Sequence, residues 1–254
     1  MARNEVVVKS MNILKLFEQH EALSLNDIVN LTGSPKTSVM RMIRSLEDME
    51  FISKRADKKY CLGLSFLHFG QLVAERLDIR RIALPYMIEL RDEVDEAVAL
   101  VVPHGDEAMY VEKVDTSQMV RVYTRVGRRA PYYAGACPRI LLAFMEPSRR
   151  EAYIESVQMV KMAAGTITDK AVLRQVLEES RKNGYSMSFS ELETGAAAIA
   201  APIFNHQGTV VGGLSILATD YRIREYQEQG GDLANRVKQK ANQVSKELGW
   251  MPRD

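Results

Sequence analysis

The chain has 254 residues, of which 46% are hydrophobic and 26% charged, and its formal net charge at pH 7 is +1. This composition is typical of a globular protein with room for two domains, and no apolar run approaches the roughly 20 residues of a membrane span. The two cysteines, Cys61 and Cys137, form no C-x-x-C pair, which argues against a disulfide framework or a cysteine zinc site. No secretory signal is visible, so we expect a cytoplasmic protein without a membrane, metal or cofactor partner.

The first 32 residues predict a loose arm and two helices. Residues 1–9 are expected to form the arm, and Ser10 is expected to cap a first helix. A second short helix is expected over residues 25–31, because Ser24 is a good N-cap and Asp27 follows three residues on, as in a capping box. The apolar residues expected to build a small core here are Ile13, Leu14, Leu16, Phe17, Ile28, Leu31, Val39, Ile43, Leu46 and Phe51.

A third helix is expected to follow, and its two faces differ. Ser34 suits the N-cap and Pro35 suits the first helical position. Apolar residues recur at helical spacing on one face, at Val39, Met42, Ile43 and Leu46. The other face carries hydroxyl and basic groups, which suit a DNA major groove, although such a face is also often plain solvated surface. The residues expected at the groove are Pro35, Lys36, Thr37, Ser38, Met40, Arg41 and Arg44.

The neighbourhood of this helix favours DNA binding. The turn Thr32-Gly33-Ser34 between two short helices is typical of a helix-turn-helix, whose tight turn needs a glycine. Residues 51–53 and 59–62 predict a small hairpin with a basic tip, which can lie along a phosphate backbone. Residues 32–60 hold seven Lys or Arg against four acids, a local excess of three. The expected phosphate contacts of this wing are Lys54, Arg55, Lys58 and Lys59.

A helix between the two halves is expected to start at Ser65. Its apolar residues, which include Phe66 and Phe69, suit a dimerisation element, or alternatively a helix that packs on its own second domain. We expect Pro85 to end it and to begin another helix over residues 86–95, so the domain boundary falls between 66 and 85.

The second half predicts antiparallel hairpins with helices, which is an α+β domain. Strands are expected at 97–102, 108–114, 119–126, 196–204 and 209–217. Helices are expected at 138–145, 148–159, 169–182 and 231–248. Thr168 is the expected N-cap of the third of these, and Gly184 lies just past its end.

Several motifs together resemble the IclR-type bacterial transcriptional regulators. In the first half they are Leu23-Ser24-Leu25, Thr32-Gly33-x-Pro35-Lys36-Thr37-Ser38-Val39-x-Arg41 and Tyr60-x-Leu62-Gly63. In the second half they are Val126-Gly127-x-Arg129-x-Pro131, Arg181-x-x-Gly184-Tyr185, Glu191, Gly195-x-x-x-Ile199-Ala200-Ala201-Pro202-Ile203 and Leu214-Ser215-Ile216.

The resemblance implies an α+β fold with three parts: a winged helix-turn-helix at 1–65, a linker helix at 66–84 and an antiparallel-sheet (GAF/profilin-like) effector domain at 85–254. It also implies a cytoplasmic regulator that binds a double-stranded operator as a dimer or a dimer of dimers and responds to a small organic effector. Most such regulators are repressors, which we expect here, and some are activators. An organic acid or an aromatic metabolite is the expected effector.

The effector pocket implied by position comprises Met119, Val122, Ala130, Gly135, Ala136, Cys137, Ser188, Ala198, Ser215 and Leu217. Gly135 and Ala136 precede a helix and would offer backbone N–H groups to a carboxylate. Ser188 and Ser215 would supply hydroxyl groups within mostly apolar walls. The alternative is that these residues simply pack around one end of a sheet. The chain departs from the family pattern at Tyr133, Pro138, Arg139 and 188–190, so its ligand is expected to differ from the small keto acids of some relatives.

The rival class is an enzyme, or a redox sensor that uses Cys137. A cysteine nucleophile needs a base beside it, but the histidines are scattered, at His20, His68, His104 and His206. Residues 213–217 lack the final glycine of a nucleophile elbow, and the sequence has no P-loop, G-x-G-x-x-G or H-E-x-x-H motif. We therefore expect no catalytic activity.

Overall fold

The computed structural model describes residues 4–76 and 78–251, and the chain divides into two compact units, Met1–Arg76 and Leu77–Asp254. Leu77, in the expected linker helix, lies outside the described residues. Each unit has a hydrophobic core of its own. No helix in the described part of the chain has the length and apolar character that a bilayer span requires.

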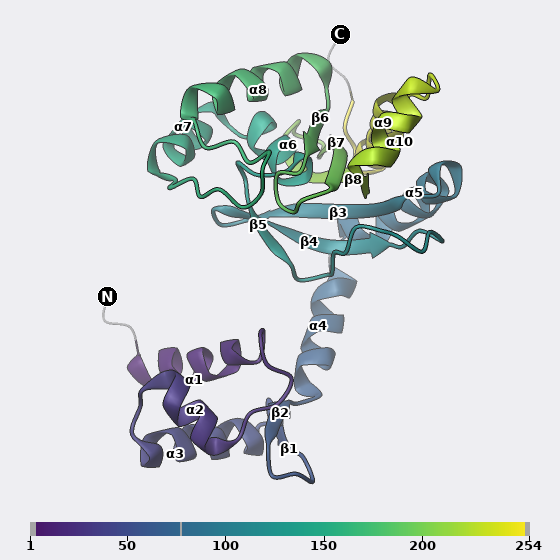
Figure 1. The fold of residues 1–254 in the computed structure, drawn as a ribbon. Coiled ribbons are helices and arrows are strands. Elements are labelled where there is room, and N and C mark those ends of the chain that lie inside the picture. Colours follow the sequence, from purple (N-terminus) through teal and green to yellow (C-terminus); the bar gives the residue numbers. More distant parts are fainter. Residues whose placement is uncertain (1–3, 77, 252–254) are drawn as a thin grey trace. The chain divides into compact units, whose positions relative to one another are not determined.

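The first unit is a winged helix-turn-helix (Figure 1). Its elements are α1 (Glu5–Leu16), α2 (Leu25–Thr32), α3 (Lys36–Asp48), β1 (Ile52–Lys54), β2 (Tyr60–Leu62) and α4 (Ser65–Arg76). The predicted capping box of α2 is confirmed: Ser24 N–H donates to the Asp27 carboxylate at 2.9 Å, and Asp27 N–H donates to Ser24 Oγ at 3.2 Å. Gly33 ends α2 with a φ of 62°, a left-handed conformation that favours glycine at the turn.

Two helix starts in this unit differ from expectation. The expected arm is wrong for residues 5–9, and Ser10 lies inside a helix, because α1 begins at Glu5, where the Asn4 side chain accepts hydrogen bonds from Val6 and Val7 N–H. Residues 1–3 of the expected arm lie outside the described residues. Ser34 does not cap α3. Pro35 is the N-cap, with an extended backbone, and its side chain can make no cap hydrogen bond.

The core of the first unit is close to the predicted set. The buried apolar side chains are Ile13, Leu14, Phe17, Leu23, Ile28, Val39, Met42, Ile43, Leu46 and Ile52. Leu31 is an error of the prediction, because it is 52% exposed on the outer face of α2. Gly63 follows the wing, where a Cβ atom would lie 2.0 Å from the Glu50 carbonyl oxygen, so only glycine fits between wing and α3.

The second unit is built on a six-stranded antiparallel sheet in the order β5-β4-β3-β8-β7-β6. The strands are β3 (Ala97–His104), β4 (Glu107–Val114), β5 (Arg129–Pro131), β6 (Ser186–Phe189), β7 (Ala196–Phe204) and β8 (Val210–Thr219). The helices are α5 (Asp78–Val94), α6 (Ala136–Phe144), α7 (Pro147–Ser156), α8 (Lys170–Asn183), α9 (Asp220–Glu228) and α10 (Leu233–Glu247). The expected hairpins at 97–114 and 196–217 are therefore confirmed.

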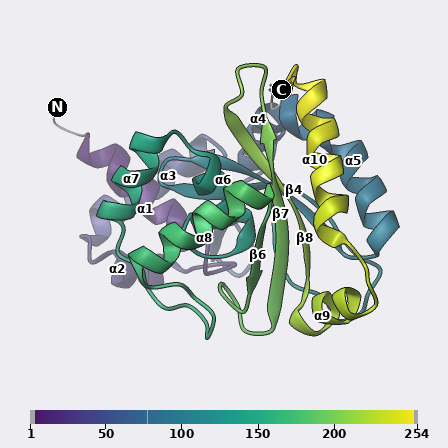
Figure 2. The same ribbon diagram turned by 90° about the horizontal axis from the view of Figure 1, so that it is seen from above.

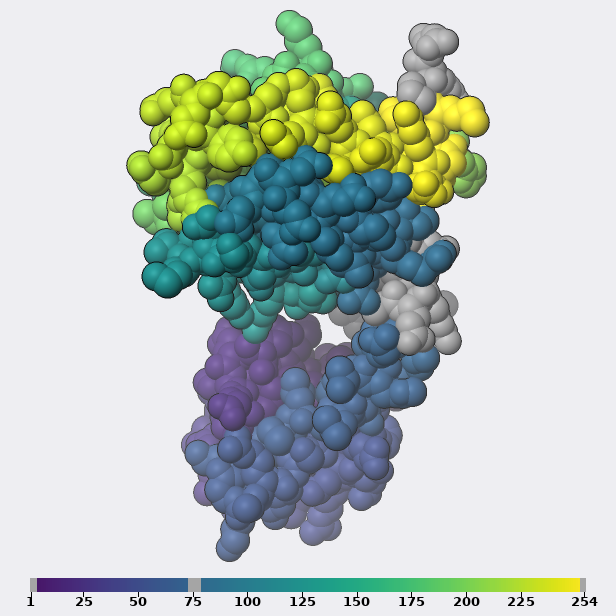
Figure 3. Space-filling model, turned by 90° about the vertical axis from the view of Figure 1, so that its right-hand side faces the viewer, coloured from purple at the N-terminus to yellow at the C-terminus, as the bar shows by residue number. Residues whose placement is uncertain are grey.

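Helices cover both faces of this sheet. Figure 2 shows α5 and α10 on one side of the strands and α6, α7 and α8 on the other. Figure 3 shows α5 and α10 lying side by side on the surface of this unit. Two apolar cores result, one between the sheet and α5 with α10, and one between the sheet and α6 with α8.

The expected strand at 119–126 is wrong, although its sequence alternates. Residues 115–128 leave the sheet because the Asp95 carboxylate accepts hydrogen bonds from Thr116, Ser117 and Gln118 at 2.6–3.2 Å. The place beside β4 is taken instead by the short strand β5, where Ala130 pairs with Ala108. A tertiary contact thus overrides a local strand pattern.

Other boundaries were also missed. Pro85 lies inside α5 and does not begin a helix, because burial of Ile79 and Ala83 against the sheet extends the helix toward its N-terminus. Asp169, not Thr168, caps α8 through hydrogen bonds from Ala171 and Val172 N–H. Strand β6 and helix α9 were not predicted from the sequence.

Candidate nucleic-acid interface and ligand cavity

Helix α3 buries one face and exposes the other. Val39, Met42, Ile43 and Leu46 are buried in the core of the first unit. Of the seven residues expected at a groove, Pro35, Lys36, Thr37, Arg41 and Arg44 are exposed, and Ser38 and Met40 are half-buried. Within the described residues, no acidic side chain forms an ion pair with Lys36, Arg41 or Arg44. The three cations of this face are therefore available to phosphates or base edges.

The wing presents its basic residues unequally. Lys54, Arg55, Lys58 and Lys59 are all exposed around the β1–β2 turn. Arg55 Nη1 lies 2.9 Å from Glu21 Oε1, so its charge is already compensated within the unit. Lys54 Nζ lies 5.5 Å from the centre of the Tyr60 ring, a cation–π contact that leaves its charge free. Lys58 stands at the turn with a φ of 64°.

The second unit contains a cavity at one end of the α6 face of the sheet. It measures about 400 Å³ including its open mouth. Its lining residues are Tyr110, Val122, Thr124, Arg128, Gly135, Ala136, Cys137, Ser188, Leu192, Glu193, Ala196, Ala197, Ala198 and Leu217.

The structure brings seven of the ten residues expected in an effector pocket to this cavity. They are Val122, Gly135, Ala136, Cys137, Ser188, Ala198 and Leu217. Met119 does not line it, because it is 94% exposed on the loop that Asp95 pulls away from the sheet. Ala130 is buried in the β4–β5 pair, and Ser215 Oγ donates to the Ala99 carbonyl in the sheet. The structure therefore does not bring these three residues to the cavity.

Four polar residues of the cavity, Arg128, Glu193, Thr124 and Tyr110, were not predicted from the sequence. Arg128 Nη2 lies 2.7 Å from Glu193 Oε1, and its guanidinium lies over the Tyr110 ring at 6.0 Å. Thr124 is 2% exposed, and its Oγ1 has no hydrogen-bond partner within the described residues. Burial raises the pKa of the Tyr110 hydroxyl well above its ordinary value, so this group is a neutral hydrogen-bonding group. The signal for Thr124, Arg128 and Glu193 was their closeness in sequence to the motifs at Val126 and at Glu191, whereas no motif pointed to Tyr110.

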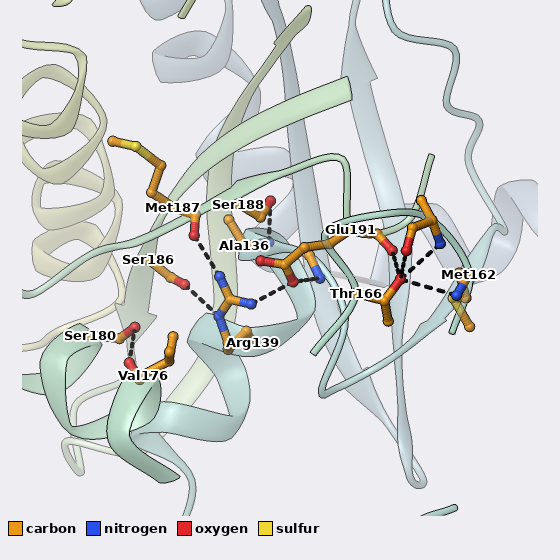
Figure 4. A network of polar contacts seen from close by, with 12 residues as sticks. Ala136, Arg139, Met162, Thr166, Val176, Ser180, Ser186, Met187, Ser188 and Glu191 are labelled. Atoms are coloured by element: carbon orange, nitrogen blue, oxygen red, sulfur yellow. Dashed lines mark hydrogen bonds and ion pairs between the residues drawn. The ribbon is translucent and has the colours of Figure 1, made fainter. Parts of the chain in front are cut away.

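The N-terminus of α6 does not offer its first N–H groups to a ligand, contrary to expectation. Gly135 N–H donates to Glu191 Oε2 and Ala136 N–H donates to Ser188 Oγ, both at 2.9 Å. Figure 4 shows this network, in which buried Arg139 donates to Glu191, to Ser186 Oγ and to the Met187 carbonyl. Glu191 and Ser188 thus hold α6 against β6 and the loop that follows it.

Cys137 lacks the surroundings of a reactive thiol. Its side chain is fully buried, and this burial raises the pKa of the thiol above its ordinary value of 9.0. It hydrogen-bonds to Ser215 and Tyr110, and neither group is a base that could deprotonate it. The cysteine-based alternatives therefore receive no support from the structure.

A helix-turn-helix with an exposed basic face, joined to a unit with a small internal cavity, defines a DNA-binding transcriptional regulator. The chain belongs to the IclR family of bacterial transcriptional regulators. The model of the IclR helix-turn-helix domain matches residues 6–56, and that of the bacterial transcriptional regulator IclR C-terminal domain matches residues 71–246. The family and its members are regulators of transcription, and the protein is not an enzyme.

Individual relatives match along the whole chain. The HTH-type transcriptional regulator KipR of Bacillus subtilis is 50% identical over 248 residues, which cover 98% of each chain. The crystal structure of Thermotoga maritima IclR has a TM-score of 0.77 and 27% identity, and the match covers 97% of this chain and 99% of that one. An IclR homologue from Microbacterium hydrocarbonoxydans, crystallised with 4-hydroxybenzoate, has a TM-score of 0.83 at 23% identity, over 96% of this chain and 98% of that one.

Proposed function

We propose that this regulator is a repressor whose operator binding is controlled by a small organic metabolite, bound in the cavity of the second unit. In this proposal residues 1–65 read the operator, residues 66–84 connect the units and residues 85–254 bind the effector. Repression needs only occupancy of the DNA, which one reading unit and one sensing unit can provide. Activation would need a further surface that recruits the transcription machinery.

The observation that carries the sensing role is the Thr124 hydroxyl in the cavity lining, which has no hydrogen-bond partner in the described part of the chain. A buried polar group without a hydrogen bond costs about 1–3 kcal/mol, so such groups are rare unless something binds them. Apolar walls from Val122, Ala198 and Leu217 with a few polar anchors are typical of a small-molecule site. The relative that was crystallised with 4-hydroxybenzoate supports an organic ligand for this fold.

We further propose that the active form is a homodimer, or a pair of dimers. Helix α1 exposes Val6, Val7, Val8 and Met11, and the N-terminal part of α4 exposes Leu67 and Phe69. Apolar side chains gathered on a helix face and left in water commonly mark an interaction surface. Paired recognition helices would read two half-sites about 34–36 Å apart or a multiple of that distance.

The proposed control is a shift between two arrangements of the dimer. A metabolite that fits one arrangement of the cavity walls better would favour that arrangement, and with it one spacing of the paired α3 helices. The shift can be no larger than the difference in affinity of the ligand for the two arrangements, about 5.5 kcal/mol for a change from 1:99 to 99:1.

The test is transcription in vitro from the promoter beside the gene of this protein. We expect the purified protein to lower the transcript and a metabolite that stabilises the protein against heat to restore it. A transcript that rises with added protein would make the protein an activator. A protein bound to the promoter whose affinity no stabilising metabolite changes would contradict the proposed control.

A further inference from the structure

The cavity is lined by one basic and one acidic side chain, and these two side chains face each other. Among its described lining residues Arg128 is the only basic side chain and Glu193 the only acidic one, and their closest atoms lie 2.7 Å apart. At the start of α6, the N–H groups of the N-cap Gly135 and of Ala136 are occupied by Glu191 and Ser188. An anionic ligand in this cavity therefore has the Arg128 guanidinium as its charged partner.

The two members of this pair are not equally fixed. Arg128 is 25% exposed, donates to the Tyr123 carbonyl at 3.3 Å and lies over the Tyr110 ring. Glu193 is 44% exposed and forms no other ion pair in the described residues. Because an exposed carboxylate regains its hydration when it turns outward, leaving the pair costs Glu193 little. Arg128 is held at the cavity and Glu193 is the replaceable partner.

We infer that Arg128 is the anion anchor of the cavity and that Glu193 is its resting counter-ion, which the carboxylate of a small organic acid displaces. Thr124 supplies a hydrogen bond to a second polar group of that acid, because its buried hydroxyl lines the same cavity as Arg128 and has no partner among the described residues. This inference rests on the proposed metabolite control and names the chemistry of the ligand. Arg–carboxylate pairing, often bidentate, would then set specificity for acids over their neutral amides.

The competition has a measurable consequence. The Glu193 carboxylate must move away from Arg128 before the carboxylate of a ligand can bind there, and its negative charge repels that ligand over a few ångströms. Removal of that charge should tighten the binding of acids and leave the binding of amides unchanged. Removal of the Arg128 charge should weaken the binding of acids alone.

The test uses calorimetric titration of the full chain with matched acids and amides: lactate with lactamide, pyruvate with pyruvamide, and 4-hydroxybenzoate with 4-hydroxybenzamide. We expect at least one acid to bind more tightly than its amide. Arg128→Gln should lower the affinity for that acid about tenfold or more, and Glu193→Gln should raise it about tenfold. The matched controls are Arg129→Gln and Glu107→Gln, whose side chains face each other at 3.8 Å away from the cavity lining, and they should change nothing.

A further variant tests the role of the Thr124 hydroxyl. Thr124→Val keeps the shape of the side chain, and it should erase a preference for lactate over propionate while propionate binds as before. Full affinity of Arg128→Gln for the acid, with Tm unchanged, would overturn the inference. Equal affinities of acid and amide in the unchanged protein would also overturn it and leave metabolite control standing. If no acid or amide binds at all, the inference falls, and the proposed effector control by such compounds falls with it.

Discussion

Arg139 Nη1 lies 2.5 Å from Glu191 Oε2, and that same oxygen accepts the Gly135 N–H at 2.9 Å. The two side chains are 1% and 8% exposed. Because Arg139 belongs to α6 and Glu191 to the loop after β6, this pair joins two walls of the cavity. A charge pair buried this deeply contributes to the position of the walls, and breaking it should be costly.

We expect Arg139→Met to lower the free energy of unfolding of the second unit by about 3–5 kcal/mol, because Glu191 would remain buried without its partner. The measurement is urea unfolding of the full chain, followed by circular dichroism. Arg174→Met is the control, since Arg174 pairs with Glu151 and Glu155 at the surface, where solvent screening leaves such a pair little effect on stability. Equal losses in the two variants would contradict the structural role of the Arg139–Glu191 pair.

Glu96 predicts a pH dependence of stability. Burial raises the pKa of its carboxyl from 4.5 to about 7; Arg222, 2.7 Å away, opposes this and Asp95 adds to it. The folded state therefore binds the proton more tightly than the unfolded state. Ionisation of Glu96 therefore lowers the free energy of unfolding. This effect is absent below about pH 4.5, grows between pH 4.5 and 7 and is complete above pH 7, where it reaches about 3 kcal/mol at most.

We expect Glu96→Gln to raise the Tm more at pH 8 than at pH 5, because the amide carries no charge to bury at either pH. The measurement is thermal unfolding of both proteins across this range. An equal change in Tm at both pH values would show that Glu96 does not titrate between them.

Ala198 offers a way to fill the cavity without touching the DNA-binding unit. Ala198→Leu should abolish the response of operator binding to an effector, because Ala198 lines the cavity and the larger side chain occupies part of its space. Overpacking should cost about 1–3 kcal/mol of stability. Operator affinity without effector should be unchanged. The control is Ala164→Leu on the surface, and an effector response that survives in Ala198→Leu would place the ligand elsewhere.

Local sequence patterns predicted much of this fold. The capping box at Ser24, the apolar face of α3 and both long hairpins depend on contacts close in sequence or on simple periodicity, so they could be recognised directly. The segment 119–126 alternates as a strand does, but Asp95, more than 20 residues away, holds its start out of the sheet. Pro85 is tolerated inside α5 because neighbouring residues are buried against the sheet. Such long-range contacts cannot be recognised from a local pattern in a single sequence.

The cavity was predictable only in outline. Six residues at the start of α6 and on β6, β7 and β8 could be placed by resemblance and line the space, and Val122 joins them from the loop before β5. Arg128, Glu193 and Thr124 come from loops, whose course depends on long-range contacts. Ser215 shares the strand β8 with Leu217, yet its hydroxyl is used by the Ala99 carbonyl within the sheet. Because residues two apart on a strand face the same side of the sheet, the alternation of side chains could not predict that Leu217 lines the cavity and Ser215 does not.

The wing residues predict a graded effect of charge on DNA binding. Lys58→Ala should reduce the slope of log K against log salt concentration by about 0.9, because one phosphate contact is lost whatever the sequence. Arg55→Ala should reduce it less, since Glu21 already compensates that charge. The measurement is fluorescence anisotropy with operator and unrelated DNA over a series of salt concentrations. A larger effect for Arg55 than for Lys58 would contradict this view of the wing.

The central claim is that the exposed face of α3 reads the operator, and Arg41 lies on that face without an ion-pair partner in the described residues. The most direct measurement is the affinity of Arg41→Ala for a fragment of its own promoter, compared with Lys15→Ala on α1. We expect Arg41→Ala to bind about 5- to 150-fold more weakly, with an unchanged Tm, and Lys15→Ala to bind as the unchanged protein does. An Arg41→Ala protein that keeps full, sequence-specific and salt-sensitive binding would contradict the account.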